Sequence, residues 1–528
     1  MSTAKYTPLN CLPNDVEALK KIIADKDLCI DQQHNIIQLK QQRITQLEEY
    51  LLLSRAKIFG VSTEKSAEQH DMFNEAELSV AAETILTEQE AEREASTPAP
   101  KRKKKAGRKP LPPELPRVRI EHRVTDEERT CPCGCERIVI GEESSEQLDI
   151  IPAKVQVLVH VRKKFACKYC EDGVKTVAMP AQPIPKSNAS PGTLAHIVIA
   201  KYVDGVPLYR QEAGLNRSGV DIPRNTLASW MIKSGELIQP LINLLDDRLL
   251  NYPVMHCDET TLQVLKEPDK HAAQKSYMWV RAGGPPTQPI RLFHYGASRK
   301  AQVVNALLAG YQGYLQTDDY AGYNAVGIQH GITQLGCWAH ARRKFVDAQK
   351  VASNKTKKAG KADIAINLIA KLYAIEKRIK SLGTEEKLTV RQQEAVPLLD
   401  TLRQWLDKTL HTTLPKGLLG KALSYIDRNW TKLTVYTQDG RLSIDNNRAE
   451  NAIRPFVIGR KNWLFSASVR GAKSSANLYS LIETAKANGL EPYAYLRHVF
   501  KELPKVTTVE DIEMLLPWEI DRDTIAIR

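Results

Sequence analysis

The chain has 528 residues, which is enough for several domains with buried cores of their own. Its formal net charge of +13 and pI of about 9.1 favour a polyanionic partner. No run of 18 apolar residues occurs and the first residues lack a signal-peptide core, so we expect a cytoplasmic protein that binds no membrane.

The first region, residues 1–66, is predicted to contain one long helix over 15–58 that self-associates. Apolar residues recur along it every seven positions, and such a heptad seam is typical of a coiled coil. The seam residues are Val16, Ile23, Ile30, Ile37, Ile44 and Leu51. The companion position also holds Lys26, Gln33 and Lys40, so the repeat is imperfect. The alternative is a helix that packs on its own chain.

Residues 67–117 read as a linker that is first acidic and then basic. Nine acidic side chains lie between 67 and 96, and prolines at six positions from 98 to 116 prevent a packed helix. A cationic run ends in Gly107-Arg108-Lys109-Pro110, which loosely resembles a minor-groove arm of the AT-hook type. Arg108 and Lys109 are therefore predicted to contact DNA, with non-specific attraction to phosphate as the simpler alternative.

Residues 118–186 are predicted to form a small domain stabilised by structural Zn²⁺. Five of the nine cysteines lie here, where a cytoplasmic setting favours metal ligands or free thiols over disulfides. Cys167 and Cys170 have the spacing of a zinc knuckle, and two of Cys131, Cys133 and Cys135 would complete a four-thiolate site. Strands are expected at 148–151 and 155–162. Free buried thiols are the alternative.

Residues 187–250 have the pattern of two short helices, a turn at Gly219 and a third helix opened by Pro223 to Thr226. This order is that of a helix-turn-helix, which would direct Arg224 and Asn225 toward a DNA major groove. Short helix pairs are also common in helical domains that bind no DNA.

Residues 251–350 are predicted to start a catalytic core. Strands are expected at 254–265, 277–282 and 290–295, followed by a helix at 298–309, a strand that ends at Asp318, a helix near 320–326, a strand at 332–337 and a basic helix. Three strands joined by tight turns and then strands alternating with helices indicate a ribonuclease-H-like mixed sheet. The fold class is thus multidomain α+β.

A helical insertion is expected at 351–440, before the second part of the core at 441–503 and a C-terminal tail at 504–528. The core resumes with SIDNNRAENAIRP, residues 443–455, which reads as a helix capped by Asp445 and stopped by Pro455. Its polar residues would share one face, with little apolar surface to bury: Asn446, Asn447, Glu450, Asn451 and Arg454. The alternative is a solvated face on which Glu450 pairs with Arg454.

In such a sheet the middle of the first strand lies beside the end of the fourth, so Asp258 and Asp318 would face each other. A helix that follows the last strand would bring Glu450 to the same edge. Three carboxylates are tolerated together when they share divalent metal, and Mg²⁺ or Mn²⁺ suits oxygen ligands. The pattern predicts a two-metal site for in-line attack on phosphorus.

Basic and aromatic residues near this site are predicted to contact DNA. His340, Arg342 and Arg343 share one helix and suit a phosphate backbone, with a solvated basic face as the alternative. A hairpin-like segment is expected after the Glu450 helix, with Trp463 placed to stack on an unpaired base or to join the core. The flanking candidates for DNA contact are Arg454, Arg460 and Lys461.

Long stretches resemble the transposases of the insertion-sequence-66 family, and the resemblance covers nearly the whole chain. The matching stretches are KIFGVSTEKS (57–66), QPIPKSNASPGTLAHIVIAKYVDGVPLYRQE (182–212), CDET (257–260), LQTDDYAGYN (315–324), CWAHARRKF (337–345) and DNNRAENAIRPFVIGRKNWLF (445–465). Two features depart from the family pattern: Thr261 stands where proline is commoner, and the first cysteine cluster is compressed.

The resemblance implies an Asp-Asp-Glu triad of Asp258, Asp318 and Glu450, with the ligand directly after Leu-Gln-x selecting Asp318 over Asp319. It implies a DNA transposase that cuts element ends and joins them to a target, with double-stranded DNA, a second copy of the chain and small accessory proteins as partners. One alternative is an inactive DNA-binding regulator. Another is a tyrosine-type recombinase, prompted by His340-x-x-Arg343 and a late tyrosine, Tyr493 or Tyr495.

Overall fold

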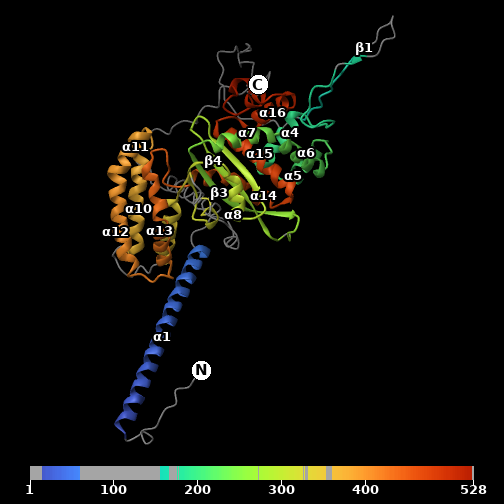
Figure 1. Ribbon diagram of the computed structural model, residues 1–528. Helices are drawn as coiled ribbons and strands as arrows, with labels where there is room; N and C mark the ends of the chain where they lie inside the picture. Colours follow the sequence, from blue (N-terminus) through green and yellow to red (C-terminus); the bar gives the residue numbers. More distant parts are fainter. Residues whose placement is uncertain are drawn as a thin grey trace, which may run out of the picture. The chain divides into compact units, whose positions relative to one another are not determined.

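The computed structural model describes residues 15–59, 155–165, 175–176, 178–271, 273–324, 326, 331–351 and 360–525. The chain divides into two compact units, one of Thr87–Met179 and one that combines Met1–Leu86 with Pro180–Arg528 (Figure 1). The larger unit carries the three candidate catalytic acids. Within the described ranges, no helix combines the length and apolar character needed to cross a membrane.

The N-terminal helix α1, Val16–Phe59, confirms the long helix predicted from the heptad pattern. All six seam residues are exposed, from 47% at Ile44 to 64% at Val16. Contacts with the rest of the unit come from the C-terminal part of α1, where the Gln46 side chain donates to the Lys416 carbonyl at 2.9 Å. The apolar seam of the helix is therefore not used for packing within the described part of the chain.

In the smaller unit, strand β1 (Lys164–Phe165) pairs antiparallel with β2 (Lys175–Thr176). The prediction of a strand at 155–162 is wrong, because residues 155–163 form no strand. Alternating valines there are at least 78% exposed at Val157, Val159 and Val161, and a strand needs a hydrogen-bonding partner as well as alternation. The strand predicted at 148–151 and the five cysteines, Cys131, Cys133, Cys135, Cys167 and Cys170, lie outside the described residues, as do Arg108 and Lys109.

Helices α4 (Pro191–Tyr202), α5 (Leu208–Arg217) and α6 (Arg224–Leu237) confirm the three helices predicted here. A fourth helix, α7 (Gln239–Leu250), follows them. Ser190 caps α4 by accepting the Thr193 backbone N–H at 3.1 Å. Gly219 lies between α5 and α6 with φ of +78°, a conformation that glycine adopts without strain. Arg224 and Asn225 are exposed at the start of α6, as the helix-turn-helix interpretation requires.

The central sheet has the strand order β5-β4-β3-β6-β7, and a short strand, β8, also pairs with β3. β3 pairs antiparallel with β4, and β4 with β5, whereas β3, β6 and β7 run parallel. Every strand predicted between 254 and 337 is confirmed, within a few residues at the ends. These strands are β3 (Val254–Lys266), β4 (Lys275–Gly283), β5 (Ile290–Gly296), β6 (Gly313–Gln316) and β7 (Ile332–Leu335). The short strand β8 is Ser466–Ser468.

Helices cover both faces of this sheet (Figure 1). Helix α8 (Ala301–Leu307) lies on the face that carries Arg281, whose guanidinium donates to the Leu307 carbonyl at 2.7 Å. Helix α15 (Val469–Ala487) lies alongside the edge strand β5, and its Ser480 hydroxyl accepts the Phe293 backbone N–H at 2.7 Å. The shorter elements are η3 (Ala321–Tyr323), α16 (Pro492–Glu502), η7 (Leu503–Lys505), α17 (Val509–Glu513) and α18 (Arg522–Ile525).

Between β7 and the Glu450 helix the described chain is helical, as predicted, and it forms a hydrophobic core separate from that of the sheet (Figure 1). Buried Leu, Ile and Ala side chains recur at helical spacing in these segments, which explains how a lysine-rich sequence still packs. The elements are α9 (Trp338–Val351), α10 (Lys361–Arg378), α11 (Thr384–Val390), η5 (Arg391–Ala395), α12 (Val396–Leu410), α13 (Leu418–Thr434) and η6 (Val435–Gln438).

Helix α14, Asn447–Trp463, corrects three details of the sequence interpretation. It runs through Pro455 instead of stopping there; proline removes one hydrogen bond, and the carbonyl four residues earlier belongs to the exposed Asn451, which water can reach. It also buries a full apolar side, including Phe456. The residues expected in a hairpin, from Arg454 to Trp463, are part of this helix.

Candidate active site

Strand β3 carries the first candidate acid, Asp258, near its middle. Successive side chains alternate between the two faces of a strand, so His256 and Asp258 share the face opposite Cys257 and Glu259. The His256 imidazole Nδ1 is 3.2 Å from the Asn446 side-chain oxygen at the start of α14, which places α14 over the Asp258 face. The partly buried Asp258 carboxylate accepts the backbone N–H of Glu259 at 2.8 Å.

The second acid, Asp318, follows directly after β6. Because β6 pairs parallel with β3 through His256↔Gln316, the chain leaves β6 beside the middle of β3. The Asp318 carboxylate accepts the Tyr320 backbone N–H at 3.0 Å, which holds the turn after the strand. Its other oxygen lies 3.7 Å from the Arg299 guanidinium. Parallel pairing with β3 thus sets the position of Asp318.

The third acid, Glu450, lies in the first turn of α14 and is only 6% exposed. Asn446 fixes the start of this helix: its side-chain amide donates to the Cys257 carbonyl at 2.8 Å, and its backbone N–H donates to the Cys337 sulfur at 3.3 Å. The single residue Asn446 therefore joins β3, the start of α9 and the start of α14. Buried polar groups need such partners, which is why a buried Asn is stable here.

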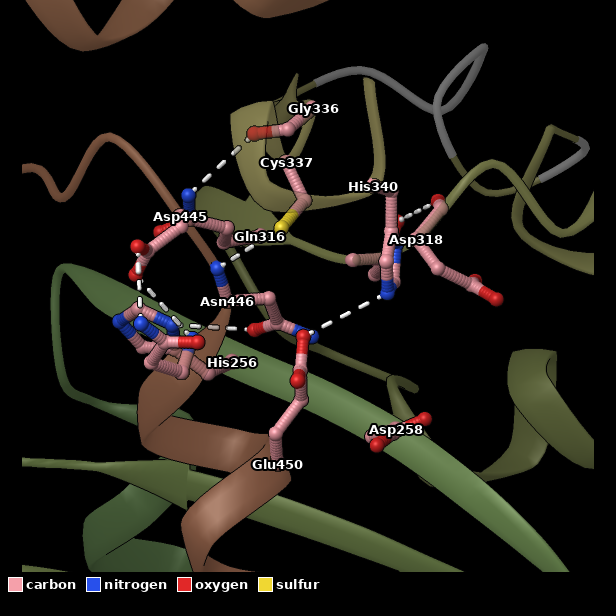
Figure 2. A network of polar contacts seen from close by, with 12 residues as sticks. His256, Asp258, Gln316, Asp318, Gly336, Cys337, His340, Asp445, Asn446 and Glu450 are labelled. Atoms are coloured by element: carbon pink, nitrogen blue, oxygen red, sulfur yellow. Dashed lines mark hydrogen bonds and ion pairs between the residues drawn. The ribbon is translucent and has the colours of Figure 1, made fainter. Parts of the chain in front are cut away.

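The three acids are brought together from distant parts of the chain. Figure 2 shows Glu450 pointing toward His340, with Asp318 next to His340 and Asp258 on the strand below them. Loss of hydration raises the pKa of Asp258 well above its usual range, and the negative charges of Glu259, Asp318 and Glu450 raise it further. Carboxylates that repel one another in this way form a strong site for a divalent cation, because a cation removes the repulsion and oxygen is its preferred ligand.

The neighbouring acids have cationic partners of their own. The Glu259 carboxylate lies 2.5 Å from the Arg299 guanidinium and accepts the Tyr323 hydroxyl at 3.0 Å. Burial raises the pKa of Glu259 to about 7, with Asp318 adding to the rise and Arg299 opposing it. Asp319 forms an ion pair with Arg428 of α13. The ion pairs of Glu259 and Asp319 are closer than the 3.7 Å contact between Asp318 and Arg299, which favours Asp258 and Asp318 as the cation ligands of the two motifs.

The basic residues predicted to contact DNA are placed unequally. Arg342 is exposed on α9, Arg343 is partly buried there, and His340 is buried beside Glu450. Within α14, Arg454 and Trp463 are partly buried and Lys461 is exposed. Arg460 donates to the Thr261 hydroxyl at 2.9 Å on β3, and burial lowers the pKa of Arg460 to about 10.

Trp463 lies within an aromatic cluster, at the C-terminal end of α14. Its ring meets Phe456 edge-on with centroids 5.3 Å apart, and the Lys201 ammonium lies 5.8 Å from the Trp463 ring centroid. The Tyr479 ring belongs to the same cluster, with its centroid 5.3 Å from that of Phe456. This packing favours the core alternative for Trp463 over base stacking.

Sequence reasoning did not find Arg299, His256 or Cys337 as residues of the site, and it placed Asn446 on the polar face of the Glu450 helix without its partners. Each contributes through a tertiary contact with a residue far along the chain, such as the His256–Asn446 bond across 190 positions. A usable signal was present only for Cys337, because Cys-x-x-His at a helix start has the spacing of a pair of metal ligands.

Comparison with known proteins adds independent information. The chain matches the family described as Transposase IS66 family over residues 186–474, and the IS66 C-terminal element over 480–518. It matches the zinc-finger binding domain of transposase IS66 over 128–171 and the Transposase C of IS166 homeodomain over 46–120.

Three Sinorhizobium fredii proteins are similar along most of their length. Uncharacterized protein y4qI is 30% identical over 98% of this chain and 99% of its own. Uncharacterized protein y4jD is 32% identical over 79% of this chain and 82% of its own. Uncharacterized protein y4hP is 31% identical over 89% of this chain and 88% of its own.

Proposed function

This chain belongs to the IS66 family of transposases, and from that premise we propose that it cuts DNA at the ends of its insertion sequence and joins those ends to target DNA. The observation that carries the proposal is the convergence of Asp258, Asp318 and Glu450 from β3, the end of β6 and α14. A bound cation would relieve the mutual repulsion of these acids, and phosphodiester chemistry uses such a cation.

We assign the catalytic part of the chain to the ribonuclease-H-like fold. The support is the strand order β5-β4-β3-β6-β7, in which three antiparallel strands come first and two parallel strands follow. In that topology the first strand is central, and the end of the fourth strand lies beside it. The helical insertion then separates the second acid from the third along the chain.

Magnesium or manganese would be held by the carboxylates of Asp258, Asp318 and Glu450. When bound, the ion supplies Lewis-acid stabilisation of phosphate oxygens and a more acidic water. The residues of the chain do the rest. Asn446 fixes the start of the helix that carries Glu450, and the turn at Tyr320 orients Asp318. The positively charged guanidinium of Arg299 lies beside Asp318, where it could bind a phosphate.

The test is cleavage of a labelled DNA duplex that carries an end of the element encoding this chain. We expect nicking at the end and joining to a second duplex in Mg²⁺ or Mn²⁺, and neither reaction in EDTA. End-specific binding without cleavage in any divalent metal would show an inactive DNA-binding regulator instead. A covalent protein–DNA adduct formed in EDTA would show a tyrosine-type recombinase; Tyr495 is a poor nucleophile, since its buried hydroxyl donates to the Leu515 carbonyl at 2.9 Å.

Adjacent acids provide a matched pair of variants at the end of β6. We expect Asp318→Asn to lower the nicking rate by at least about 10³-fold, because a cation ligand that stabilises the transition state by several kcal/mol is lost. Asp319→Asn should change it by less than about tenfold, since Asp319 pairs with Arg428. Initial rates at saturating Mg²⁺ measure both. A larger loss of nicking in Asp319→Asn than in Asp318→Asn would instead assign the cation ligand to Asp319.

Recognition of the element ends is assigned to the regions before the sheet. The exposed Arg224 and Asn225 at the start of α6 suit base edges in a major groove. The zinc module would add its own surface, with Zn²⁺ held by Cys167, Cys170 and two of the first three cysteines. Arg108 and Lys109 of the linker would attract phosphate, and the net charge of +13 fits the same polyanionic partner.

Helix α1 is assigned as the contact between two copies, since both ends of an element must be held at once. Its heptad seam is exposed in the single chain, and a second seam would bury it. The complex would act on DNA in the bacterial cytoplasm, together with any small accessory proteins of the same element.

This assignment makes the mass of the particle depend on seam residues. We expect Ile30→Glu combined with Ile37→Glu to convert a dimer or larger assembly into monomers, because charges at seam positions oppose packing. Asn35→Glu, on the opposite side of the helix, should leave the assembly intact. Light scattering during size-exclusion chromatography measures each mass. An unchanged mass for the double variant would place the contact elsewhere.

A further inference from the structure

Cys337, His340 and Glu450 form a buried cluster at the junction of α9 and α14. One possible ligand atom from each lies within 4.8 Å of the other two, and all three residues are buried. The His340 Nε2 is 3.4 Å from a Glu450 carboxylate oxygen. Ligand atoms around tetrahedral Zn²⁺ lie about 3.5 Å apart, so the cluster needs a closure of roughly 1 Å to reach that geometry.

The cluster has the donors of a transition-metal site and not of a magnesium site. A thiol and an imidazole are soft or borderline ligands, which select zinc over the hard cations that carboxylates alone would bind. The His340 ring lies next to Glu450, and its side chain is only 4% exposed. Glu450 supplies the single anionic oxygen.

The surroundings of Cys337 suit a thiolate. Cys337 stands immediately before α9, where the N-terminal end of a helix stabilises negative charge. The backbone N–H of Asn446 donates to the sulfur at 3.3 Å, and the backbone N–H of His340 also donates to it. Burial keeps the free thiol protonated by raising its pKa, so metal binding would release one proton to solvent.

We infer that Cys337, His340 and Glu450 bind one Zn²⁺ ion, separate from the zinc of the cysteine-rich module. Zinc binding is independent of the proposed transposase activity. Its consequence rests on that activity: Glu450 belongs to both sites, so zinc at this cluster withdraws the third acid from magnesium and holds the enzyme inactive. Zinc would thus act as an inhibitor that Mg²⁺ alone does not displace.

The test measures zinc per chain in full-length protein that has been equilibrated with Zn²⁺ and freed of loosely bound metal. We expect Cys337→Ser and His340→Gln each to hold one Zn²⁺ fewer than the unaltered chain. Cys257→Ser is the matched control, because Cys257 is a second buried thiol of the same unit and lies outside the cluster. The cysteine-rich module is unchanged in every variant, so its zinc cancels in the comparison.

Cobalt provides the second readout, because a thiolate bound to Co²⁺ gives a charge-transfer absorption band. The cobalt spectrum of the unaltered chain minus that of Cys337→Ser should contain this band at one equivalent, and the melting temperature of each variant shows that it is folded. Equal zinc content in folded Cys337→Ser, Cys257→Ser and unaltered chains would overturn the proposal.

Failure of the zinc site and failure of the proposed function give different results. Zinc content and nicking are measured on separate samples. If the zinc-equilibrated chain holds the Cys337-dependent zinc but the zinc-free chain does not nick DNA in Mg²⁺, the transposase assignment is rejected and the zinc site stands. Normal nicking with no such equivalent would do the opposite. With both present, micromolar Zn²⁺ added in excess Mg²⁺ should suppress nicking at least tenfold.

Discussion

Asp258→Asn is expected to lower metal-dependent nicking by at least about 10³-fold and to make the metal-free protein no less stable. The rate falls because a ligand that contributes several kcal/mol to transition-state stabilisation is lost. Stability is kept because the pKa of Asp258 is raised by lost hydration and by neighbouring carboxylates. A raised pKa in the folded state means that the charged form opposes folding at neutral pH, and the amide removes that charge.

Melting temperature and nicking rate are measured together to separate a catalytic role from a structural one. In EDTA the variant should melt at or above the temperature of the unaltered chain. Added Mg²⁺ should raise the melting temperature of the unaltered chain and have less effect on the variant, because binding to the folded state stabilises it. A variant that melts well below the unaltered chain would show that Asp258 serves the fold, and retained nicking would remove it from the site.

Arg391→Ala should lower the free energy of unfolding of the helical insertion by about 3–5 kcal/mol, the usual cost of leaving one partner of a buried ion pair alone. Arg391 is 2% exposed and pairs with Glu376 at 2.7 Å. Its guanidinium also donates to the backbone carbonyls of Tyr436, Asp439 and Leu442 at 2.8–2.9 Å. These carbonyls belong to the segment that leads into α14, so nicking should fall as well.

Two controls accompany this variant, with denaturant unfolding followed by the fluorescence of the insertion tryptophans. Arg378 forms an exposed pair with Glu394, and Arg378→Ala should leave the unfolding midpoint unchanged. Replacing both Arg391 and Glu376 by methionine should recover part of the loss, because no buried charge then lacks a partner. Equal midpoints for Arg391→Ala and Arg378→Ala would show that the buried pair does not hold the insertion together.

The elements of this fold follow from local patterns, and most could be predicted for that reason. The heptad pattern predicted α1, and strand-like apolar runs predicted the strands of the sheet between 254 and 337. The strand at 155–162 failed because alternation says nothing about whether a partner strand exists. Pro455 failed as a stop signal because the cost of one lost hydrogen bond is small beside the apolar side that α14 buries.

The sequence predicts the three acids of the candidate site but not the residues that hold them in position. Asp258 and Asp318 follow from strand position and topology, since parallel pairing sets which residues meet. Glu450 is predicted at the same edge, with a solvated face paired to Arg454 as the alternative, and the structure buries it beside His340 of α9. Such partners are tertiary, and no local period in the sequence encodes the meeting of His256 with Asn446 across 190 positions.

Because the helical insertion lies between β7 and α14, Glu450 is synthesised well after Asp258 and Asp318 during translation. A ribosome that stops between residues 318 and 450 releases a chain with two of the three candidate acids and without the third. Truncated products of the gene would therefore be unable to break chromosomal DNA. On the proposed function, only a chain that includes Glu450 could do so.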